Sequence, residues 1–407
     1  MKAVPSQDSN QRPLKVLHLV SAGSEGNATV NGLLLPLLLR GDRRSVQSRV
    51  VHFAPGHPHA GVVRQAGIPV HEIRLSKKRW SPMAVRELVQ VAREFSPDVI
   101  HAWGHTATLA GVLLARLSRA KPRCVSSLLG TEPLSVRGGL LERSMLKFVL
   151  KVAGDIGQFV FPSEVSQSRH RRAGFPESRS AVIAAGVDVE RFKPDFAARK
   201  RVRDQLELPA NAFVIGMQAP FQPEFDHITF FKAAGEIIRA NPHARILLAG
   251  RGLQRGNAPL MALVGGGTLA TRVQLLGEWS DTAGLFNACD VVVSTALTDE
   301  LRLNVAMAML CGVPCIATGV GAQGEIIGKF GIGVEPGGEA SLVRGLTRIM
   351  EMPAERRAFM ARGARQNALA RFNLQQSIDQ CYSLYRNSVV IAPSTPEPVA
   401  VDSLTAA

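Results

Sequence analysis

Residues 298–315, TDELRLNVAMAMLCGVPC, contain the acidic pair of this sequence with the clearest capacity to hold a polar ligand. Asp299 and Glu300 begin the stretch, and ionised carboxylates form strong, charge-assisted hydrogen bonds. The apolar run VAMAML follows, and Cys-Gly-Val-Pro ends it. The pattern is an acidic pair at the start of an apolar helix that carries no further carboxylate.

A glycine-containing segment, SAGSEGNATVNG, offers a second place for a ligand. It follows the first predicted strand and opens an apolar helix, and it contains Gly23 and Gly26. Free backbone N–H groups at the start of a helix can hold a phosphate or a sugar. Gly23 and Gly26 do not make the dinucleotide fingerprint, so a plain strand-to-helix turn is the open alternative.

The cysteines do not suggest a metal site. There are five, and Cys311 and Cys315 are the pair spaced most like ligands. No second pair and no histidine cluster completes a zinc site, so we expect buried free thiols and no metal.

Composition indicates a chain with sizeable cores and an anionic partner. The hydrophobic fraction is 46%, the net charge is +15, and most of the positive charge falls in residues 1–190. Such a basic half suits a membrane surface, nucleic acid or phosphorylated sugars. Aromatic residues make up only 5%, which argues against a base-stacking surface, so we expect no nucleic acid partner.

The elements that must position these residues alternate between strand and helix. Apolar runs such as LKVLHLV (14–20) and FVIGMQA (213–219) read as buried strands, and helical patterns such as MAVRELVQVAREF (83–95) lie between strands. This alternation predicts parallel sheets covered by helices on both faces. The fold class is therefore α/β, with two doubly wound, Rossmann-like domains.

The expected domain plan has five parts. These are a disordered tail (1–13), an N-terminal domain (14–186), a linker (187–204), a C-terminal domain (205–390) whose last helix can cross back, and a disordered tail (391–407). The linker contains the polar and charged run KPDFAARKRVRDQ, and linkers between domains tend to have such a composition. Ligands of such sheets bind at the carboxyl ends of the strands, and the cleft between two facing sheets is the default site.

Several segments, in order, resemble family 4 glycosyltransferases. They are AAGVDVERFKPD (184–195), LLAGRG (247–252), VQLLGEWSDTAGLFNACDVVVSTA (273–296) and CGVPCIATGVGAQGEII (311–327). The resemblance implies the GT-B fold, in which the C-terminal domain holds a nucleotide sugar and the acceptor lies against the N-terminal domain. It also implies a retaining transfer of the sugar to a glycan or lipid-linked acceptor in cell-surface polysaccharide synthesis, without a metal or a separate cofactor.

The resemblance also assigns residues, and several depart from the family pattern. The family has two glutamates separated by seven residues; Asp299 occupies the first position and Met307 the second. Met217 stands at the arginine, Gln222 at the lysine and Pro223 at the glycine that usually follows. Neutral side chains at these positions cannot neutralise a leaving diphosphate.

The residues that we expect at the site follow from this alignment. Asp299, Glu300 and His105 are the candidate catalytic residues, with His101 as an alternative to His105 near the acceptor hydroxyl. A histidine at a strand end is also commonly a hydrogen-bonded structural residue. Arg251 or Arg302 would supply the missing positive charge. The candidate donor-binding residues are Gly216, Gln222, Gly250, Arg251, Gly252, Arg302, Gly321 and Glu325.

Two functions stay open on the sequence. One is an active, divergent glycosyltransferase, and the other is a homologue without turnover that acts as a binding or regulatory partner, because fold does not fix function.

Location is a separate expectation. The N-terminus has no signal core and no apolar run reaches about 20 residues, so we expect a cytoplasmic protein. Residues 134–154 place Arg143, Lys147 and Lys151 on one face of an amphipathic helix. This face could contact anionic lipid at the inner surface of the membrane, or it is simply a solvated face of a core-packing helix.

Overall fold

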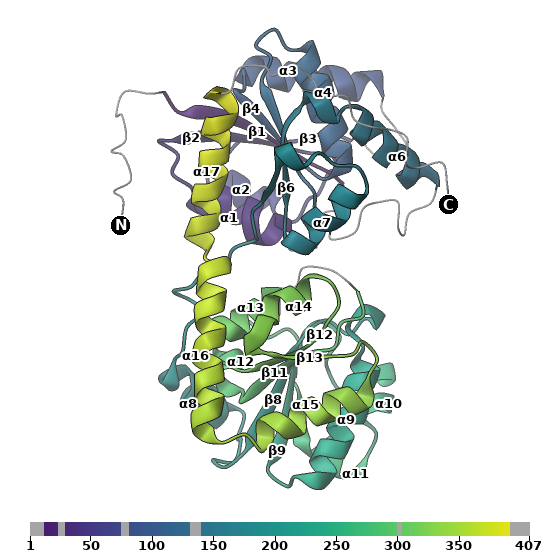
Figure 1. The fold of residues 1–407 in the computed structure, drawn as a ribbon, viewed down its shortest axis with the longest axis vertical. Coiled ribbons are helices and arrows are strands. Elements are labelled where there is room, and N and C mark those ends of the chain that lie inside the picture. Colours follow the sequence, from purple (N-terminus) through teal and green to yellow (C-terminus); the bar gives the residue numbers. More distant parts are fainter. Residues whose placement is uncertain (1–11, 23–28, 75–80, 131–139, 299–302, 391–407) are drawn as a thin grey trace. The chain divides into compact units, whose positions relative to one another are not determined.

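The computed structural model describes residues 12–22, 29–74, 81–130, 140–298 and 303–390. The chain divides into two compact units (Figure 1). Unit 1 is made of Met1–Ala184 and Ser377–Ala407, and unit 2 of Ala185–Gln376. The tail from residue 391 and most of the tail before residue 14 lie outside the described residues. Within the expected N-terminal tail, Arg12 is described and pairs with Asp98 at 2.6 Å.

Unit 1 contains a parallel sheet of seven described strands, in the order β3-β2-β1-β4-β5-β6-β7. The strands are β1 (Leu14–Val20), β2 (Val46–His52), β3 (Val70–Glu72), β4 (Val99–Trp103), β5 (Arg123–Ser127), β6 (Ile156–Phe161) and β7 (Ser180–Val182). In the register of the sheet, Val20 of β1 lies beside both His52 and Trp103. The described helices of unit 1 are η1 (Val30–Leu34), α1 (Leu35–Arg40), α2 (Ala60–Gln65), α3 (Pro82–Phe95), α4 (His105–Leu117), α6 (Leu140–Lys151), η2 (Ala153–Asp155), α7 (Glu164–Arg172), η3 (Glu177–Arg179) and most of α17 (Leu374–Val390).

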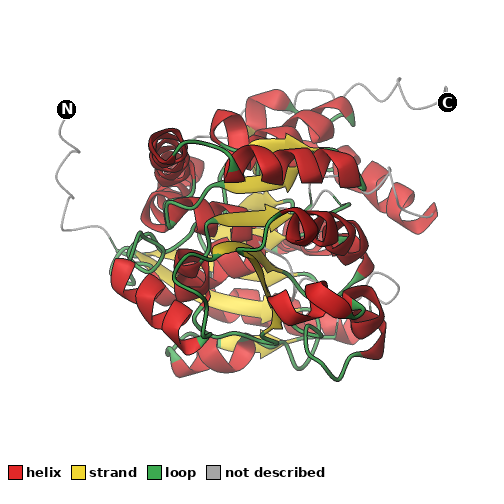
Figure 2. Ribbon diagram, turned by 90° about the horizontal axis from the view of Figure 1, so that it is seen from below, coloured by secondary structure: helices red, strands yellow, loops and turns green. Residues whose placement is uncertain are grey.

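Unit 2 repeats this plan with six described strands in the order β10-β9-β8-β11-β12-β13. The strands are β8 (Phe213–Gln218), β9 (Ala244–Ala249), β10 (Val273–Leu275), β11 (Val291–Ser294), β12 (Cys315–Thr318) and β13 (Ile332–Val334). The described helices are α8 (Phe196–Gln205), η4 (Pro223–Phe225), α9 (His227–Ala240), α10 (Ala258–Val264), α11 (Gly267–Arg272), α12 (Thr282–Ala288), α13 (Leu303–Leu310), α14 (Ala322–Ile327), η5 (Gly328–Phe330), α15 (Glu339–Met350) and α16 (Ala354–Arg371). Figure 2 shows the strands enclosed by helices, so the predicted fold class of two doubly wound parallel sheets is confirmed.

Local sequence explains where the helices begin. Helix α9 starts after Asp226, whose carboxylate accepts a hydrogen bond from the Thr229 N–H, and it ends at Ala240, with Asn241 as its C-cap just before a proline. Side-chain caps of this kind satisfy one of the free N–H groups of the first turn. Helix α3 starts in the same way at Ser81, which caps the Ala84 N–H. Buried residues then recur at helical spacing in both helices.

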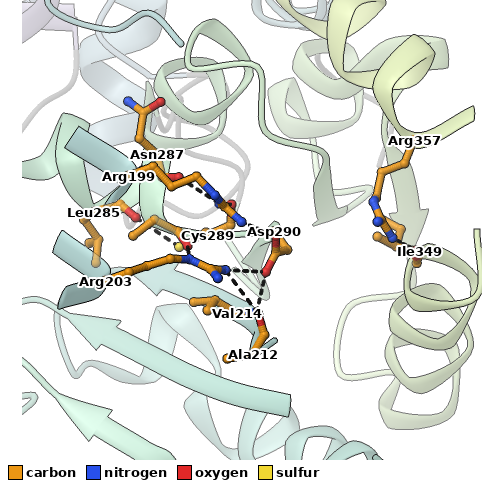
Figure 3. Close-up of polar contacts among 11 residues, drawn as sticks. Arg199, Arg203, Ala212, Val214, Leu285, Asn287, Cys289, Asp290, Ile349 and Arg357 are labelled. Carbon is orange, nitrogen blue, oxygen red and sulfur yellow. Dashed lines mark hydrogen bonds and ion pairs between the residues drawn. The ribbon is translucent and has the colours of Figure 1, made fainter. Parts of the chain in front are cut away.

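The segment expected as a linker is instead part of unit 2. Residues 196–205 form α8, whose Arg199 and Arg203 reach the carboxylate of Asp290 at 2.6 and 2.7 Å (Figure 3). Asp290 also accepts a hydrogen bond from the Val214 N–H at the start of β8. The charged run is typical of a linker in the sequence alone, because the carboxylate that its arginines contact lies far along the chain.

The C-terminal helical region contains a break. Helix α16 ends at Arg371 and α17 begins at Leu374. Between them, Phe372 O accepts a hydrogen bond from the Val187 N–H, and the Leu374 N–H donates to Val187 O. A backbone bridge to Val187 therefore replaces the helical hydrogen bonds at this point and separates the two helices.

Candidate functional site

The carboxyl edge of the unit 2 sheet gathers the described part of the expected donor site. The ends of β8, β9 and β12 lead into Gln222, Arg251 and Gly321 respectively. Gln222 and Arg251 are exposed. Asp299, Glu300 and Arg302 lie outside the described residues, as do Gly23 and Gly26 of unit 1.

Gly216 has a structural role in β8. It lies in the middle of β8 and is buried, and a Cβ atom at this position would lie 2.3 Å from the Sγ of Cys289. The position of Gly216 thus has a packing explanation, and its donor-binding role stays a prediction. The glycine is required because β8 packs directly against the buried Cys289 thiol.

Replacing Gly216 by alanine should destabilise unit 2 by about 1–3 kcal/mol, the usual cost of overpacking a core. Combining this change with Cys289→Ala should recover much of the loss, because it removes the sulfur atom that the new methyl group meets. Thermal and urea unfolding of the two variants and of Cys289→Ala alone measure both effects. Equal stability of wild type and Gly216→Ala would contradict this packing argument.

Gly250 and Gly252 shape the turn that follows β9. Their φ angles are +148° and +83°, and a Cβ on Gly250 would lie 2.1 Å from the carbonyl oxygen of Ala219. The Gly250 N–H donates to Gly277 O at 2.7 Å. These glycines bring the turn close to the end of β8 and leave the side chain of Arg251 exposed beside it.

The end of β8 carries no cation. Met217 is 2% exposed and belongs to the apolar core that includes Ile215. Gln218 and Asn304 border a recess beside it of only about 10 Å³, which is room for about one water molecule. The described recess is therefore too small for a diphosphate.

Glu325 has a fixed partner. It lies in α14, and its Oε1 accepts a hydrogen bond from the Nη2 of Arg371 at 2.6 Å. Nη1 of Arg371 also donates to the backbone carbonyl of Glu325. The arginine at the end of α16 therefore orients the one expected donor carboxylate that the structure describes.

His101, the alternative catalytic histidine, is a core residue of unit 1. It is 1% exposed, with Nδ1 2.6 Å from the Tyr385 hydroxyl and Nε2 2.8 Å from Ser127 Oγ. Burial, and then the nearby His18, lowers its pKa well below the usual value. A catalytic role for His101 is therefore wrong, because both ring nitrogens are already used inside the core.

His105 remains at the carboxyl edge of the unit 1 sheet. It is the first residue of α4 and is half-buried. The Oγ of Ser21, which follows β1, accepts a hydrogen bond from the Ala107 N–H and so caps α4. Gly104, between β4 and α4, has φ +91° and leaves no room for a Cβ beside Ser21. The end of β1 thus holds the start of α4, and His105 with it.

The comparisons with known proteins bear on both units. A family model described as glycosyl transferases group 1 matches residues 212–352, and one described as glycosyltransferase family 4 matches residues 37–191. The chain belongs to glycosyltransferase family 4. Its fold is accordingly GT-B.

Individual relatives agree with this family. The chain is 29% identical over 229 residues to D-inositol 3-phosphate glycosyltransferase of Mycobacterium tuberculosis, which is 53% of this chain and 45% of that protein. The matched part thus spans about half the length of that relative. The Anabaena protein HepE in complex with UDP is 25% identical, with a TM-score of 0.77 over 92% of this chain and all of that chain. A glycosyltransferase from Rickettsia africae gives a TM-score of 0.81 at 16% identity, over 94% of this chain and all of that chain.

Within the family 4 fold, two features escaped the sequence reasoning. The first is a group of histidines, with His52 at the end of β2 and His57 and His59 in the loop after it; the three residues fall within eight positions, and this clustering is the signal. The second is a cavity of about 650 Å³ in unit 1, lined by the amino-terminal ends of β5 and β6, by β7 and by α17. No motif marks this cavity, because its walls come from segments far apart in the sequence.

The predicted burial of the cysteines as free thiols is confirmed. All five thiols are buried and free, and burial raises the pKa of Cys124, Cys311 and Cys381 to about 12.

In α6, Met145, Leu146 and Val149 are buried, whereas Arg143, Lys147 and Lys151 are exposed. In the described part of the chain, no helix has the length and apolar character needed to cross a membrane.

Proposed function

We propose that this family 4 member transfers a sugar from a uridine diphosphate sugar to an acceptor hydroxyl. The observation that carries the proposal is the similarity to HepE, which extends over 92% of this chain. Structures of HepE contain UDP in one case and UDP-glucose in another. Donor binding would use the carboxyl edge of the unit 2 sheet. There Asp299, Glu300 and Glu325 would hold the sugar and ribose hydroxyls.

Charge at the diphosphate is the main requirement of this reaction. The acceptor oxygen forms a bond to the anomeric carbon as the bond from that carbon to the diphosphate oxygen breaks. Negative charge grows on the leaving diphosphate, which takes up the proton of the acceptor hydroxyl. Losing one preorganised stabilising group costs about 2.7–4 kcal/mol. Met217 and Gln222 supply no positive charge to the diphosphate. Arg251 and Arg302 are therefore proposed to supply it in their place.

A second candidate function is a nucleotide-sugar-binding partner without turnover. The observation that favours it is Met217, which lies in the apolar core where the family pattern places an arginine. The experiment that separates the two measures nucleoside diphosphate release and sugar transfer with a panel of uridine and guanosine diphosphate sugars. Thermal stabilisation by UDP without any release would select the binding partner, since a ligand of the native state raises stability. Release of UDP would select the transferase.

The acceptor is proposed to be a glycan or a lipid-linked sugar of cell-surface polysaccharide synthesis, reached in the cytoplasm at the inner face of the membrane. The exposed face of α6 supports this location. It presents Lys147, Lys151 and the aromatic ring of Phe148, which is 59% exposed. Basic side chains near anionic lipid contribute about 1 kcal/mol each, and an apolar ring adds burial in the headgroup layer.

Reversing two of these charges tests the membrane contact. Lys147→Glu/Lys151→Glu should reduce co-sedimentation with vesicles of phosphatidylglycerol and phosphatidylcholine at least tenfold. Arg356→Glu/Arg362→Glu makes the same change in charge on exposed positions of α16 and serves as the control. If both variants sediment alike, α6 is only a solvated face of a core-packing helix.

A further inference from the structure

His52 is a buried side chain whose polar atoms are unused. It is the last residue of β2 and is 3% exposed, yet neither of its ring nitrogens has a hydrogen-bond partner among the residues that the structure describes. An imidazole always carries at least one N–H group, and buried polar groups are nearly always hydrogen-bonded. The ring nitrogens of His52 therefore need hydrogen-bond partners, and a bound molecule could supply them.

The surroundings hold this ring in place. His57 stacks on it with ring centres 3.8 Å apart and planes 16° from parallel. Nδ1 of His57 accepts a hydrogen bond from the His59 N–H, so a neutral His57 carries its proton on Nε2. Nε2 of His59 lies 2.6 Å from Oδ1 of Asn31.

Glu72 fixes the loop that carries His57 and His59. Its Oε1 accepts hydrogen bonds from the N–H groups of Gly56 and His57, at 3.0 and 3.3 Å. Its Oε2 pairs with Arg64 at 3.2 Å. The carboxylate at the end of β3 thus uses both oxygens to hold the loop and adds negative charge beside the rings.

The histidines lie on the edge of the sheet where doubly wound folds bind ligands. His52 is in register with Val20 of β1, and Val20 is in register with Trp103 of β4, one residue before the turn to His105. The end of β2 therefore shares the carboxyl edge of the unit 1 sheet with His105.

We propose that His52 and His57 form a recognition site for a neutral, hydroxyl-bearing ring, a sugar or a polyol, on unit 1. A neutral imidazole offers one donor and one acceptor, which is the pairing that neighbouring hydroxyl groups need. The Glu72 carboxylate disfavours an anion at this place. No group of three or more metal-binding side chains suited to a metal ion occurs among the described residues.

The charge state of the ring agrees with a neutral ligand. Burial, followed by the effect of His57, lowers the pKa of His52 to about 3. The imidazole is therefore uncharged near neutral pH and offers no positive charge to a phosphate. If the transferase proposal holds, this site contacts the acceptor; its assignment as acceptor site rests on that proposed function, whereas binding can be measured without a donor.

The test uses the full chain without any nucleotide sugar. Glucose, galactose, mannose and myo-inositol are titrated individually, with inorganic phosphate as the anionic comparison, and the imidazole ¹⁵N signals are followed by NMR. Assignment of His52 comes from the spectrum of His52→Phe. We expect at least one neutral probe to shift the His52 signals, and phosphate to leave them unchanged. A shift with phosphate alone, or with no probe, overturns the proposal.

Variants separate recognition from a structural role. His52→Phe keeps a ring of similar size without polar atoms, and should weaken binding at least tenfold without lowering the unfolding temperature. His52→Gln restores a donor and an acceptor and should recover part of the affinity. His243→Phe, at an exposed histidine of unit 2, is the control. Unchanged affinity in His52→Phe overturns the proposal, whereas missing UDP release with intact sugar binding refutes only the transferase.

Discussion

Replacing Asp299 and Glu300 together by alanine is expected to lower nucleoside diphosphate release at least a hundredfold. The acidic pair would hold the donor sugar through charge-assisted hydrogen bonds, and loss of one preorganised group typically costs 10²–10³ in turnover. Chromatographic measurement of UDP formed from the preferred donor, with and without acceptor, gives the ratio. The single variants show which of the two carboxylates carries the effect.

The control for this pair is Glu351→Ala/Glu355→Ala, which removes two exposed carboxylates from unit 2. It should retain full activity, and both double variants should unfold at the wild-type temperature. Undiminished UDP release by Asp299→Ala/Glu300→Ala would mean that the acidic pair is not part of the donor site. The expected loss would show that the site works without a carboxylate at Met307.

Asp290→Ala should produce the largest change in stability, a loss of about 3 kcal/mol in the unfolding free energy of unit 2. The side chain of Asp290 is only 20% exposed, and it pairs with both Arg199 and Arg203 (Figure 3). Removing one member of a buried ionic group leaves the others uncompensated, which costs 3–5 kcal/mol. Because Asp290 is not fully buried, we take the lower end of this range.

A second ion pair on the same helix provides the control. Lys200 and Asp204 pair at 2.6 Å, but both side chains are more than half exposed. Asp204→Ala should therefore cost no more than about 0.5 kcal/mol. Urea unfolding of both variants gives the comparison, and Asp290→Asn shows how much of the loss is due to charge. Similar losses for Asp204→Ala and Asp290→Ala would contradict the anchoring role of Asp290.

The strands and most helices could be predicted because their signals are local. Apolar runs such as LKVLHLV and FVIGMQA mark buried parallel strands, and caps such as Asp226 mark helix starts. The α8 region shows the limit of this reasoning. Its charges suggested solvent, but Arg199 and Arg203 meet Asp290, which is 91 and 87 positions away.

The candidate site was predictable only in part. Order and spacing of the motifs placed Gly250, Gly252 and Glu325 at the carboxyl edge of the sheet, because each follows or adjoins a strand end. Burial of individual side chains was not predictable in this way. Gly216 matched its motif as well as they did, but it serves β8 packing against Cys289.

The sequence by itself determined the two parallel sheets, the family and the sheet edges at which folds of this class bind ligands, since these depend on periodicity and motif order. The tertiary structure decided which polar side chains are free to act. His101 and His52 both lie in strands near the same sheet edge. The Nδ1 of His101 forms a hydrogen bond with Tyr385, 284 residues away, whereas His52 is buried without a hydrogen-bond partner in the described part of the chain. Hydrogen-bond partners so remote in sequence are brought together only by folding, and no local pattern encodes them.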